Sequence, residues 1–79
     1  MAKYCLNCKP GVTNCVDPGK RVWEDCPEGQ QCALYFLHHE GSNHIYDLAC
    51  EGKYGVQEWV NYCKSYGSGR NQDCNYEFF

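Results

Sequence analysis

Several features of membrane and nucleic-acid-binding proteins are missing from this sequence. The longest uninterrupted apolar run, from Ala33 to Leu37, has five residues, whereas a helix that crosses a bilayer needs about 20. The seven Lys and Arg residues are scattered along the chain, and the formal net charge is −3, so no basic stripe is present to neutralise phosphates. We therefore expect no transmembrane segment and no nucleic-acid partner.

Residue patterns typical of enzymes and of glycosylated surfaces are also lacking. No nucleophile, base and orienting acid are spaced in a recognisable way, and Ser42, Ser65 and Ser68 all lie in expected turns. No Asn-x-Ser/Thr acceptor occurs, so no face is expected to be shielded by N-glycans. The sequence predicts a protein that is not an enzyme and needs no cofactor.

The chain is instead rich in cysteine, with eight in 79 residues. An even number at this density is typical of secreted domains that rely on disulfides, because so short a chain buries too little surface for a stable core. Spacing alone leaves the connectivity open. No charged and apolar leader precedes Cys5, so we expect residues 1–79 to be one secreted domain whose export signal has been removed.

Turn-forming residues divide the chain into short segments that favour β-strands. Pro and Gly clusters occur in five places, at 9–11, 17–19, 27–29, 41–43 and 67–69. The intervening segments rich in β-branched and aromatic residues are 20–25, 32–39, 44–50 and 56–63.

Two hairpins are expected from these segments. Residues 32–39 and 44–50 should pair around a polar tip, and 56–63 should run into a second hairpin whose turn is 64–71. The run from Cys32 to Leu37 is apolar at every position, which favours a central strand, although a short buried helix would have the same composition. Because no segment shows a persuasive helical period, the sequence predicts a small all-β, disulfide-rich fold.

Three cysteine motifs carry a resemblance to a known family. They are Tyr4-Cys5-Leu6-Asn7-Cys8 with Cys15 following, Cys26-Pro27-Glu28-Gly29-Gln30-Gln31-Cys32 with Leu48-Ala49-Cys50 following, and Asp73-Cys74-Asn75. In order and spacing they resemble the three-finger domains of the lymphocyte-antigen and urokinase-receptor (LU) family. The middle motif is especially similar to activin-type receptor ectodomains, and animal toxins share this fold.

The resemblance implies a three-finger (snake-toxin-like) fold with four disulfides. Finger I would span about residues 5–25, finger II about 26–50 and finger III about 51–74. The implied pairs are Cys5–Cys32, Cys8–Cys15, Cys26–Cys50 and Cys63–Cys74. The family usually has ten cysteines, so one of its disulfides is missing here. The missing disulfide is either the one inside the third finger or the one that staples the C-terminus. The second alternative fits the Gly67-Ser68-Gly69 turn better, and it leaves residues 76–79 to pack or fray.

Aromatic residues are the main candidates for a binding surface. Trp and Tyr are abundant here, and exposed Trp, Tyr and Arg are typical anchors of protein interfaces. A simpler interpretation is that the aromatics cover a thin sheet. The candidate binding residues are Trp23, Tyr35, His38, His39, Tyr46, Trp59, Tyr62, Tyr66 and Arg70. If Trp59 is an exposed anchor, Trp59→Ala should weaken partner binding and leave stability nearly unchanged.

His38, His39 and His44 bracket the expected tip of the second finger. Imidazoles titrate near neutral pH and can make a pH-dependent contact, but solvated turn residues are the simpler interpretation. Together with Cys5 and Cys8 they could also form a zinc site. The even cysteine total favours disulfides instead, and we expect no metal.

These observations predict a secreted binding module that modulates an extracellular protein, such as a receptor, growth factor or host-defence protein, by covering one of its surfaces. One alternative is the ligand-binding ectodomain of an activin-type receptor of the TGF-beta superfamily. Others are a glycolipid-anchored LU protein, whose hydrophobic tail would have been removed, and a protease inhibitor that presents an exposed loop.

Overall fold

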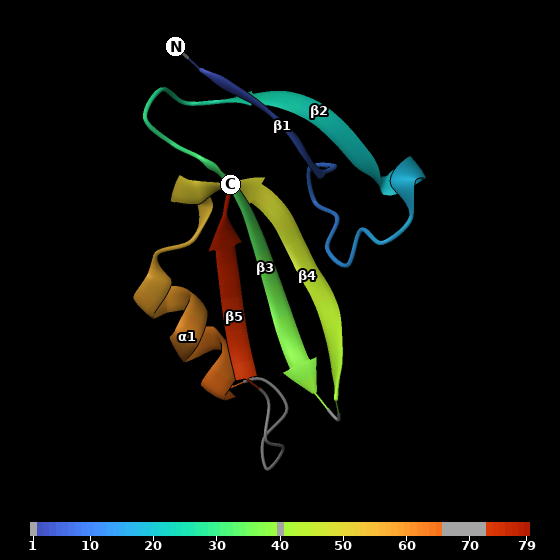
Figure 1. Ribbon diagram of the computed structural model, residues 1–79, viewed down its shortest axis with the longest axis vertical. Coiled ribbons are helices and arrows are strands. Elements are labelled where there is room, and N and C mark those ends of the chain that lie inside the picture. Colours follow the sequence, from blue (N-terminus) through green and yellow to red (C-terminus); the bar gives the residue numbers. More distant parts are fainter. Residues whose placement is uncertain (1, 40, 66–72) are drawn as a thin grey trace.

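The computed structural model of the chain describes residues 2–39, 41–65 and 73–79. It is a small, mostly β fold with two antiparallel sheets (Figure 1). Strands β1 (Lys3–Cys8) and β2 (Arg21–Cys26) pair as a two-stranded sheet. Strands β3 (Cys32–His39), β4 (Ser42–Cys50) and β5 (Asp73–Phe78) form the second sheet in the order β4-β3-β5.

The strands end where the sequence predicts turns. The connection from β1 to β2 contains the short 3-10 helix η1 (Pro18–Lys20), which begins where the Asp17 side chain accepts a hydrogen bond from the Gly19 N–H at 3.0 Å. Gly11 and Gly41 have φ angles of 79° and 78°, a backbone region that costs a residue without Cβ very little. Turn chemistry therefore sets the lengths of both hairpins.

The fourth predicted strand is wrong, because residues 56–63 lie in a helix. Helix α1 (Val56–Ser65) follows the 3-10 turn η2 (Glu51–Lys53). Trp59 and Cys63, four residues apart, lie on one face of α1 and are 1% and 4% exposed, which is the spacing of a single buried helical stripe. The β-branched and aromatic composition that suggested a strand supplies this stripe instead.

The C-terminal strand also differs from the expected third finger. Residues 73–78 form β5 and pair with β3 from Ala33↔Phe78 to His38↔Asp73. The structure thus pairs the backbone of the final residues with the central strand, while the side chains of Tyr76, Phe78 and Phe79 stay 37–57% exposed. The turn expected around Gly67-Ser68-Gly69 lies outside the described residues.

Two of the four disulfides join the two sheets, one ties α1 to β5 and one closes the loop after β1. The Cα atoms of each pair are 5.5–5.9 Å apart, within the usual range for a disulfide. No cysteine is free. The pairs are those implied by the family resemblance: Cys5–Cys32, Cys8–Cys15, Cys26–Cys50 and Cys63–Cys74.

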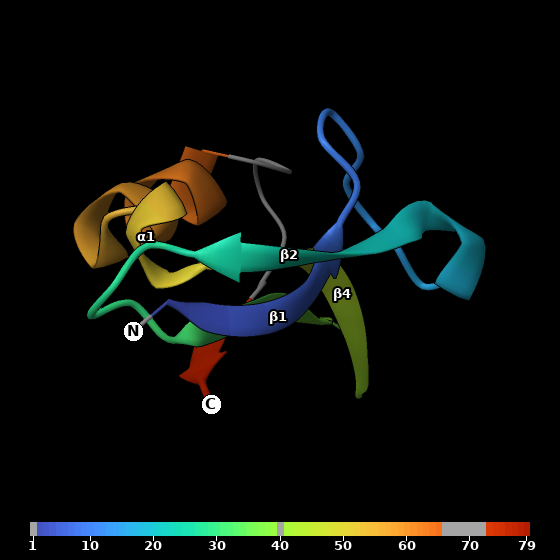
Figure 2. The same ribbon diagram turned by 90° about the horizontal axis from the view of Figure 1, so that it is seen from above.

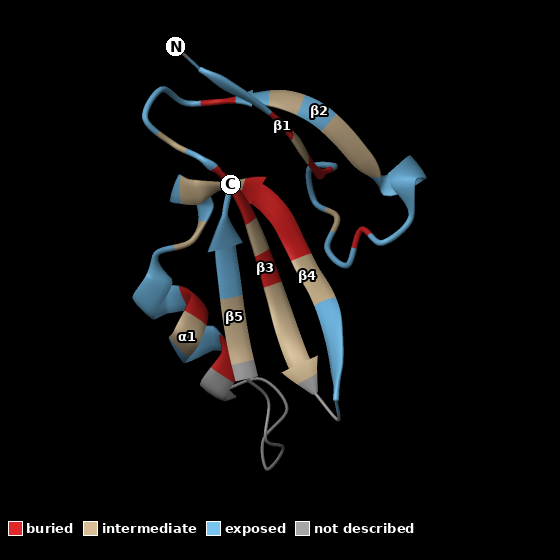
Figure 3. Cartoon of the chain, viewed as in Figure 1, coloured by how far each residue is buried: buried red, intermediate tan, exposed pale blue. Residues whose placement is uncertain are grey.

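Helix α1 covers one face of the three-stranded sheet. Its side chains pack on Ala33, Tyr35 and Ala49, which are buried on β3 and β4. In Figure 2, seen from above, the β1–β2 hairpin crosses near the end of the sheet at which the C-terminus lies. Figure 3 shows buried positions in parts of α1, in the upper part of the β3–β4 pair and at a few places in β1, β2 and the connection between them. The opposite face of the sheet has no helix of the described chain upon it.

Candidate functional site

The sheet face opposite α1 is apolar. Directly paired residues of antiparallel strands point to the same side, so the pair Tyr35↔Asp47 shares the α1 side, while Leu34↔Leu48 and Phe36↔Ile45 belong to the other. The pairing register shifts between Tyr35 and Phe36, so that the pairs on either side of this irregularity still alternate between the two faces of the sheet. Leu48 is buried, and the other three are half-buried.

A groove lies between this face and the β1–β2 hairpin. Its volume is about 500 Å³, and its apolar lining includes Leu6 of β1, Leu34 of β3, Ile45 and Leu48 of β4, and Phe79. A smaller hollow of about 250 Å³ shares Leu34 and Ile45 with it and continues toward Phe36, Asn43 and Glu77. The two hollows follow one another along the sheet, and the smaller one also has polar residues in its lining.

Two stacked aromatic rings stand at the edge of this groove. Leu6 pairs directly with Trp23, and Tyr4 pairs with Asp25, so Tyr4 and Trp23 are diagonal neighbours on one face of the hairpin. Their ring centroids are 5.2 Å apart with an interplanar angle of 20°. Tyr4 is 61% and Trp23 55% exposed. The hairpin register thus creates a rigid aromatic pair that is open to solvent.

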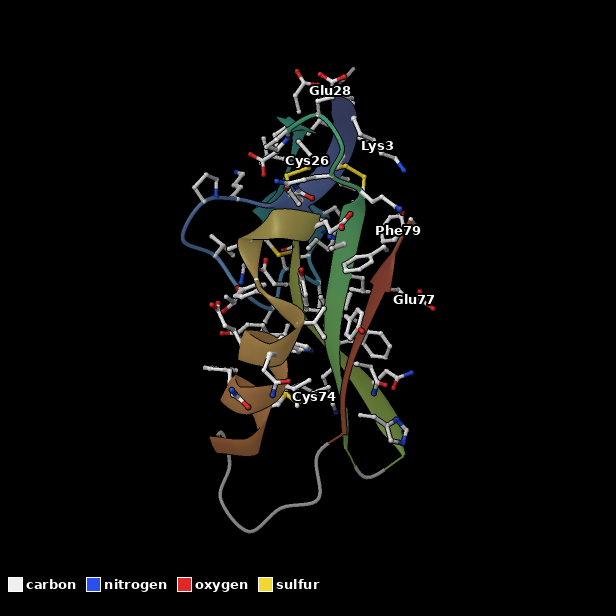
Figure 4. All side chains as sticks on the ribbon, turned by 90° about the vertical axis from the view of Figure 1, so that its left-hand side faces the viewer. Lys3, Cys26, Glu28, Cys74, Glu77 and Phe79 are labelled. Carbon is white, nitrogen blue, oxygen red and sulfur yellow. A yellow bond between two sulfur atoms is a disulfide. The ribbon has the colours of Figure 1, made fainter. Side chains whose placement is uncertain are left out.

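The charged residues that line the groove are both cationic. Lys3 donates a hydrogen bond from Nζ to the Phe79 main-chain oxygen at 2.7 Å, and Figure 4 shows these two residues close together at one end of the sheet. Arg21 donates from Nε to the Cys15 carbonyl at 2.7 Å. No acidic residue belongs to the described lining of the groove. Both cationic side chains are therefore already hydrogen-bonded to main-chain oxygens.

Four of the predicted aromatic residues form a cluster whose centre is buried. The ring of Trp59 lies 5.4 Å from that of Tyr35, 5.2 Å from Tyr46 and 6.1 Å from Tyr62, centroid to centroid. Tyr35 and Trp59 are each 1% exposed, so neither can be an exposed anchor. The helical turn that the sequence analysis missed brings Trp59 against the sheet. Of the four, Tyr62 is the most open, at 40% exposure.

A buried acidic residue lies beside this cluster. Asp47 is 0% exposed, and its Oδ2 accepts hydrogen bonds from Lys53 Nζ at 2.7 Å and from the Tyr54 hydroxyl at 2.6 Å. Burial, followed by the hydrogen bond to Asp47, raises the pKa of Tyr54, and burial also raises the pKa of Tyr35. Lys53 also lines a hollow of about 530 Å³, but Asp47 itself is not among the residues that line it. The network fixes η2 and Tyr54 on the sheet.

The remaining predicted site residues are scattered. His38 is half-buried at the end of β3, with Nδ1 2.8 Å from Asn43 Oδ1, and His44 is exposed on β4. His39 lies in β3, but its side chain is outside the described part of the structure, as are Tyr66 and Arg70. Of the predicted residues whose side chains the structure describes, Trp23 alone lines the groove.

Sequence reasoning missed Lys3, Tyr4 and Phe79 as groove residues. Tyr4 stood in the cysteine motif that carried the family resemblance, and its spacing of two from Leu6 is the signal that could have placed it on the groove side of a strand. Lys3 and Phe79 lie 76 residues apart, and no local pattern connects them.

The zinc alternative does not hold, because Cys5 and Cys8 are both in disulfides. Within the described ranges, no three His, Cys, Asp or Glu side chains are grouped to hold a metal ion. Nor does that part of the chain contain a helix with the length and apolar character needed to span a membrane.

The chain was compared with family models, curated proteins and solved structures. No family model matches it, and neither a curated protein nor a solved structure gives a significant match.

Proposed function

We propose that this protein is a secreted, non-enzymatic binding module that modulates an extracellular protein by covering one of its surfaces. Four disulfides in a short chain support an extracellular location. Their pairing also supports a relationship to the three-finger LU family, whose members use rigid segments that project from a disulfide hub. On this proposal the partner contacts the β1–β2 hairpin and the rim of the groove.

The observation that carries the proposal is the solvent-exposed stack of Tyr4 and Trp23. Both rings are more than half exposed, although a ring pair of this size gains free energy when it is buried. Tyr and Trp are enriched at the centres of protein interfaces because they bury a large rigid area at a small entropic cost. Since the hairpin is tied to the sheet by Cys5–Cys32 and Cys26–Cys50, these rings are already fixed before a partner arrives.

The rim around the stack is suited to the same role. Arg21 lies on β2 two residues before Trp23 and is held by the Cys15 carbonyl, which fixes its guanidinium group. Arginine is the third residue type that is enriched among interface anchors. An aromatic pair beside a fixed cation and an apolar groove resembles the centre of a protein interface more than an ordinary solvated surface.

The test is a binding screen against an array of extracellular receptor domains and growth factors, followed by titration of each binding protein with matched variants. Trp23→Ala should weaken binding at least tenfold, which corresponds to about 1.4 kcal/mol. Val16→Ala is the control, because Val16 is 64% exposed and does not line the groove. Partners that bind both variants equally well would show that the aromatic pair is not the contact surface.

A further inference from the structure

Strand β2 is an open edge of the two-stranded sheet. The main-chain groups of successive residues point alternately to the two sides of a strand, and the hydrogen bond from the Lys9 N–H to the Lys20 carbonyl at 2.9 Å shows which side faces β1. By this alternation the N–H and C=O groups of Trp23 and Asp25 point away from β1. Within the described chain these outward groups make no hydrogen bond, and no strand lies on that side of β2.

The outer strands of the larger sheet, β4 and β5, have less open edges. The Tyr46 carbonyl of β4 accepts a hydrogen bond from the Asn14 N–H at 2.8 Å. Helix α1 lies along β5, where Cys63 is bonded to Cys74 and the Trp59 side chain donates to a β5 carbonyl at 3.1 Å. Among the described strands, β2 therefore has the edge that is best able to accept another strand.

The charges along this edge change from basic to acidic. Lys20 and Arg21 come first, Trp23 follows, and Glu24 and Asp25 come last. Charged side chains on an edge strand usually prevent it from pairing with other strands. Antiparallel pairing of β2 with a second copy of itself avoids this, because it sets the basic start of each strand beside the acidic end of the other, and opposite charges across a strand pair are favourable. In-register parallel pairing would set like charges together.

No contact within one copy has to break for this pairing. Lys20 is exposed and has no side-chain partner in the described part of the chain, so its charge is available to the second copy. Arg21 can keep its hydrogen bonds to the Cys15 and Val16 carbonyls, because β2 offers its main chain to the second copy. The Arg21 N–H likewise stays bonded to the Pro18 carbonyl of η1.

We propose that two copies of the chain pair antiparallel through β2, with Trp23 of one copy directly opposite Trp23 of the other. The two Trp23 residues then exchange N–H to C=O hydrogen bonds, and each Asp25 N–H donates to the Arg21 carbonyl of the other copy. A shift of one residue sets outward groups against inward groups and loses these bonds. A shift of two residues either sets Glu24 directly opposite Glu24 or leaves Asp25 without its acceptor.

The result is a closed dimer with a self-complementary interface, in which the two hairpins form one four-stranded sheet. Tyr4 and Trp23 stack on one face of each hairpin. The Cα atoms of directly opposite hydrogen-bonded residues are about 5.5 Å apart, so the two stacks meet in one row of aromatic rings across the interface. This dimer goes beyond the function proposed above and forms without any other protein.

The test combines sedimentation equilibrium of the oxidised protein with amide hydrogen exchange at low and high protein concentration. The dimer fraction should rise with concentration, and exchange at Trp23 and Asp25 should slow with it. The Val22 and Glu24 amides, which point to β1, should change much less. In a mixture of labelled and unlabelled chains, a contact between the Hα atoms of Val22 and Glu24 of different copies would confirm the register. A protein that stays monomeric up to about 1 mM would overturn the proposal.

Asp25→Pro separates the strand edge from the aromatic stack. Proline is tolerated on an edge strand where the N–H faces away from the neighbouring strand, so the variant should keep the monomer fold and the stack of Tyr4 on Trp23 but lose the dimer. Undiminished dimerisation of this variant would refute pairing through β2. A monomeric wild type that still loses partner binding on Trp23→Ala would refute the dimer alone and leave the proposed function standing.

Charge reversal tests the order of charges along β2. Asp25→Lys sets a cation beside Arg21 of the other copy and should weaken dimerisation about tenfold or more. Glu77→Lys is the matched control, because it makes the same change of net charge at an exposed position of β5, and it should not weaken dimerisation. Equal weakening by both variants would refute the proposed register. Protection of the Trp23 and Asp25 amides that appears only with an added extracellular protein would assign the edge to that protein and refute the dimer.

Discussion

Replacing Trp59 by alanine is expected to destabilise the protein by about 4–6 kcal/mol, because this side chain is the centre of the core beneath α1. Trp59 is 1% exposed, and its ring contacts the rings of Tyr35, Tyr46 and Tyr54 at centroid distances of 5.2–6.0 Å. Its Nε1 donates a hydrogen bond to the Asn75 carbonyl on β5 at 3.1 Å. One side chain thus connects the helix to both β3 and β5.

The expected magnitude follows from two losses. Truncating a buried aromatic to alanine costs about 3–5 kcal/mol through lost burial and the cavity that remains. The hydrogen bond to Asn75 adds about 1 kcal/mol. Domains of this size have a free energy of unfolding of about 5–15 kcal/mol, so the variant should lose a large part of its stability even with all disulfides intact.

The assay is guanidinium-induced unfolding without reductant, followed by near-ultraviolet circular dichroism. Trp23→Ala is the matched control, since it makes the same chemical change at a position that is 55% exposed. This control should lose about 1 kcal/mol, mainly from its stack with Tyr4. If the two variants lost equal stability, the assignment of Trp59 to the core and of Trp23 to the surface would be refuted.

Three further predictions concern the contacts that hold α1 and η2. Burial and the hydrogen bond to Asp47 raise the pKa of Tyr54, so the folded state keeps the hydroxyl proton above about pH 10, where an unfolded tyrosine loses it. The free energy of unfolding should therefore fall as the pH rises above about 10. In denaturant titrations, Tyr54→Phe should make this fall less steep. Asp47→Asn removes the charge of a buried carboxylate that pairs with Lys53 and accepts a hydrogen bond from Tyr54, and it should cost at least about 1 kcal/mol. Because salt screens a buried pair only weakly, most of this difference should persist in 1 M salt, and a difference that salt abolished would contradict the burial of the pair. Replacing Cys63 and Cys74 together by serine opens a bridge between positions 11 residues apart and should lower the free energy of thermal unfolding by about 3 kcal/mol. An unchanged free energy of unfolding would show that packing alone holds the helix.

The parts of the fold that the sequence predicted are those determined locally or by cysteine order. The expected strands 20–25, 32–39 and 44–50 correspond closely to β2, β3 and β4, because alternation and turn residues act over a few positions. The small β fold with its disulfides is confirmed.

Helix α1 could not be recognised in the same way. The segment contains residue types that favour strands, namely Val56, Trp59, Val60 and Tyr62. It is helical because the helix lets Trp59 pack on Tyr35 and Ala33 at one face of the sheet. Propensity is a weak prior that such tertiary contacts override. This error also reversed the expected role of Trp59.

The groove was beyond local reasoning for a different reason. It arises from the position of one sheet relative to the other, and its lining combines β1, β3, β4 and Phe79. Trp23 could be singled out as an aromatic residue on a strand, but its partner Tyr4 follows only from the β1–β2 register.

The buried residues fall into separate clusters, one beneath α1 and two around the remaining disulfides. Cooperative units of this kind can open independently, and the bridge Cys63–Cys74 ties α1 to β5 and not to the β1–β2 hairpin. Amide hydrogen exchange should therefore be faster in α1 than in β1 and in the start of β3. A protein bound to the β1–β2 hairpin could then stay in place while the helix opens and closes.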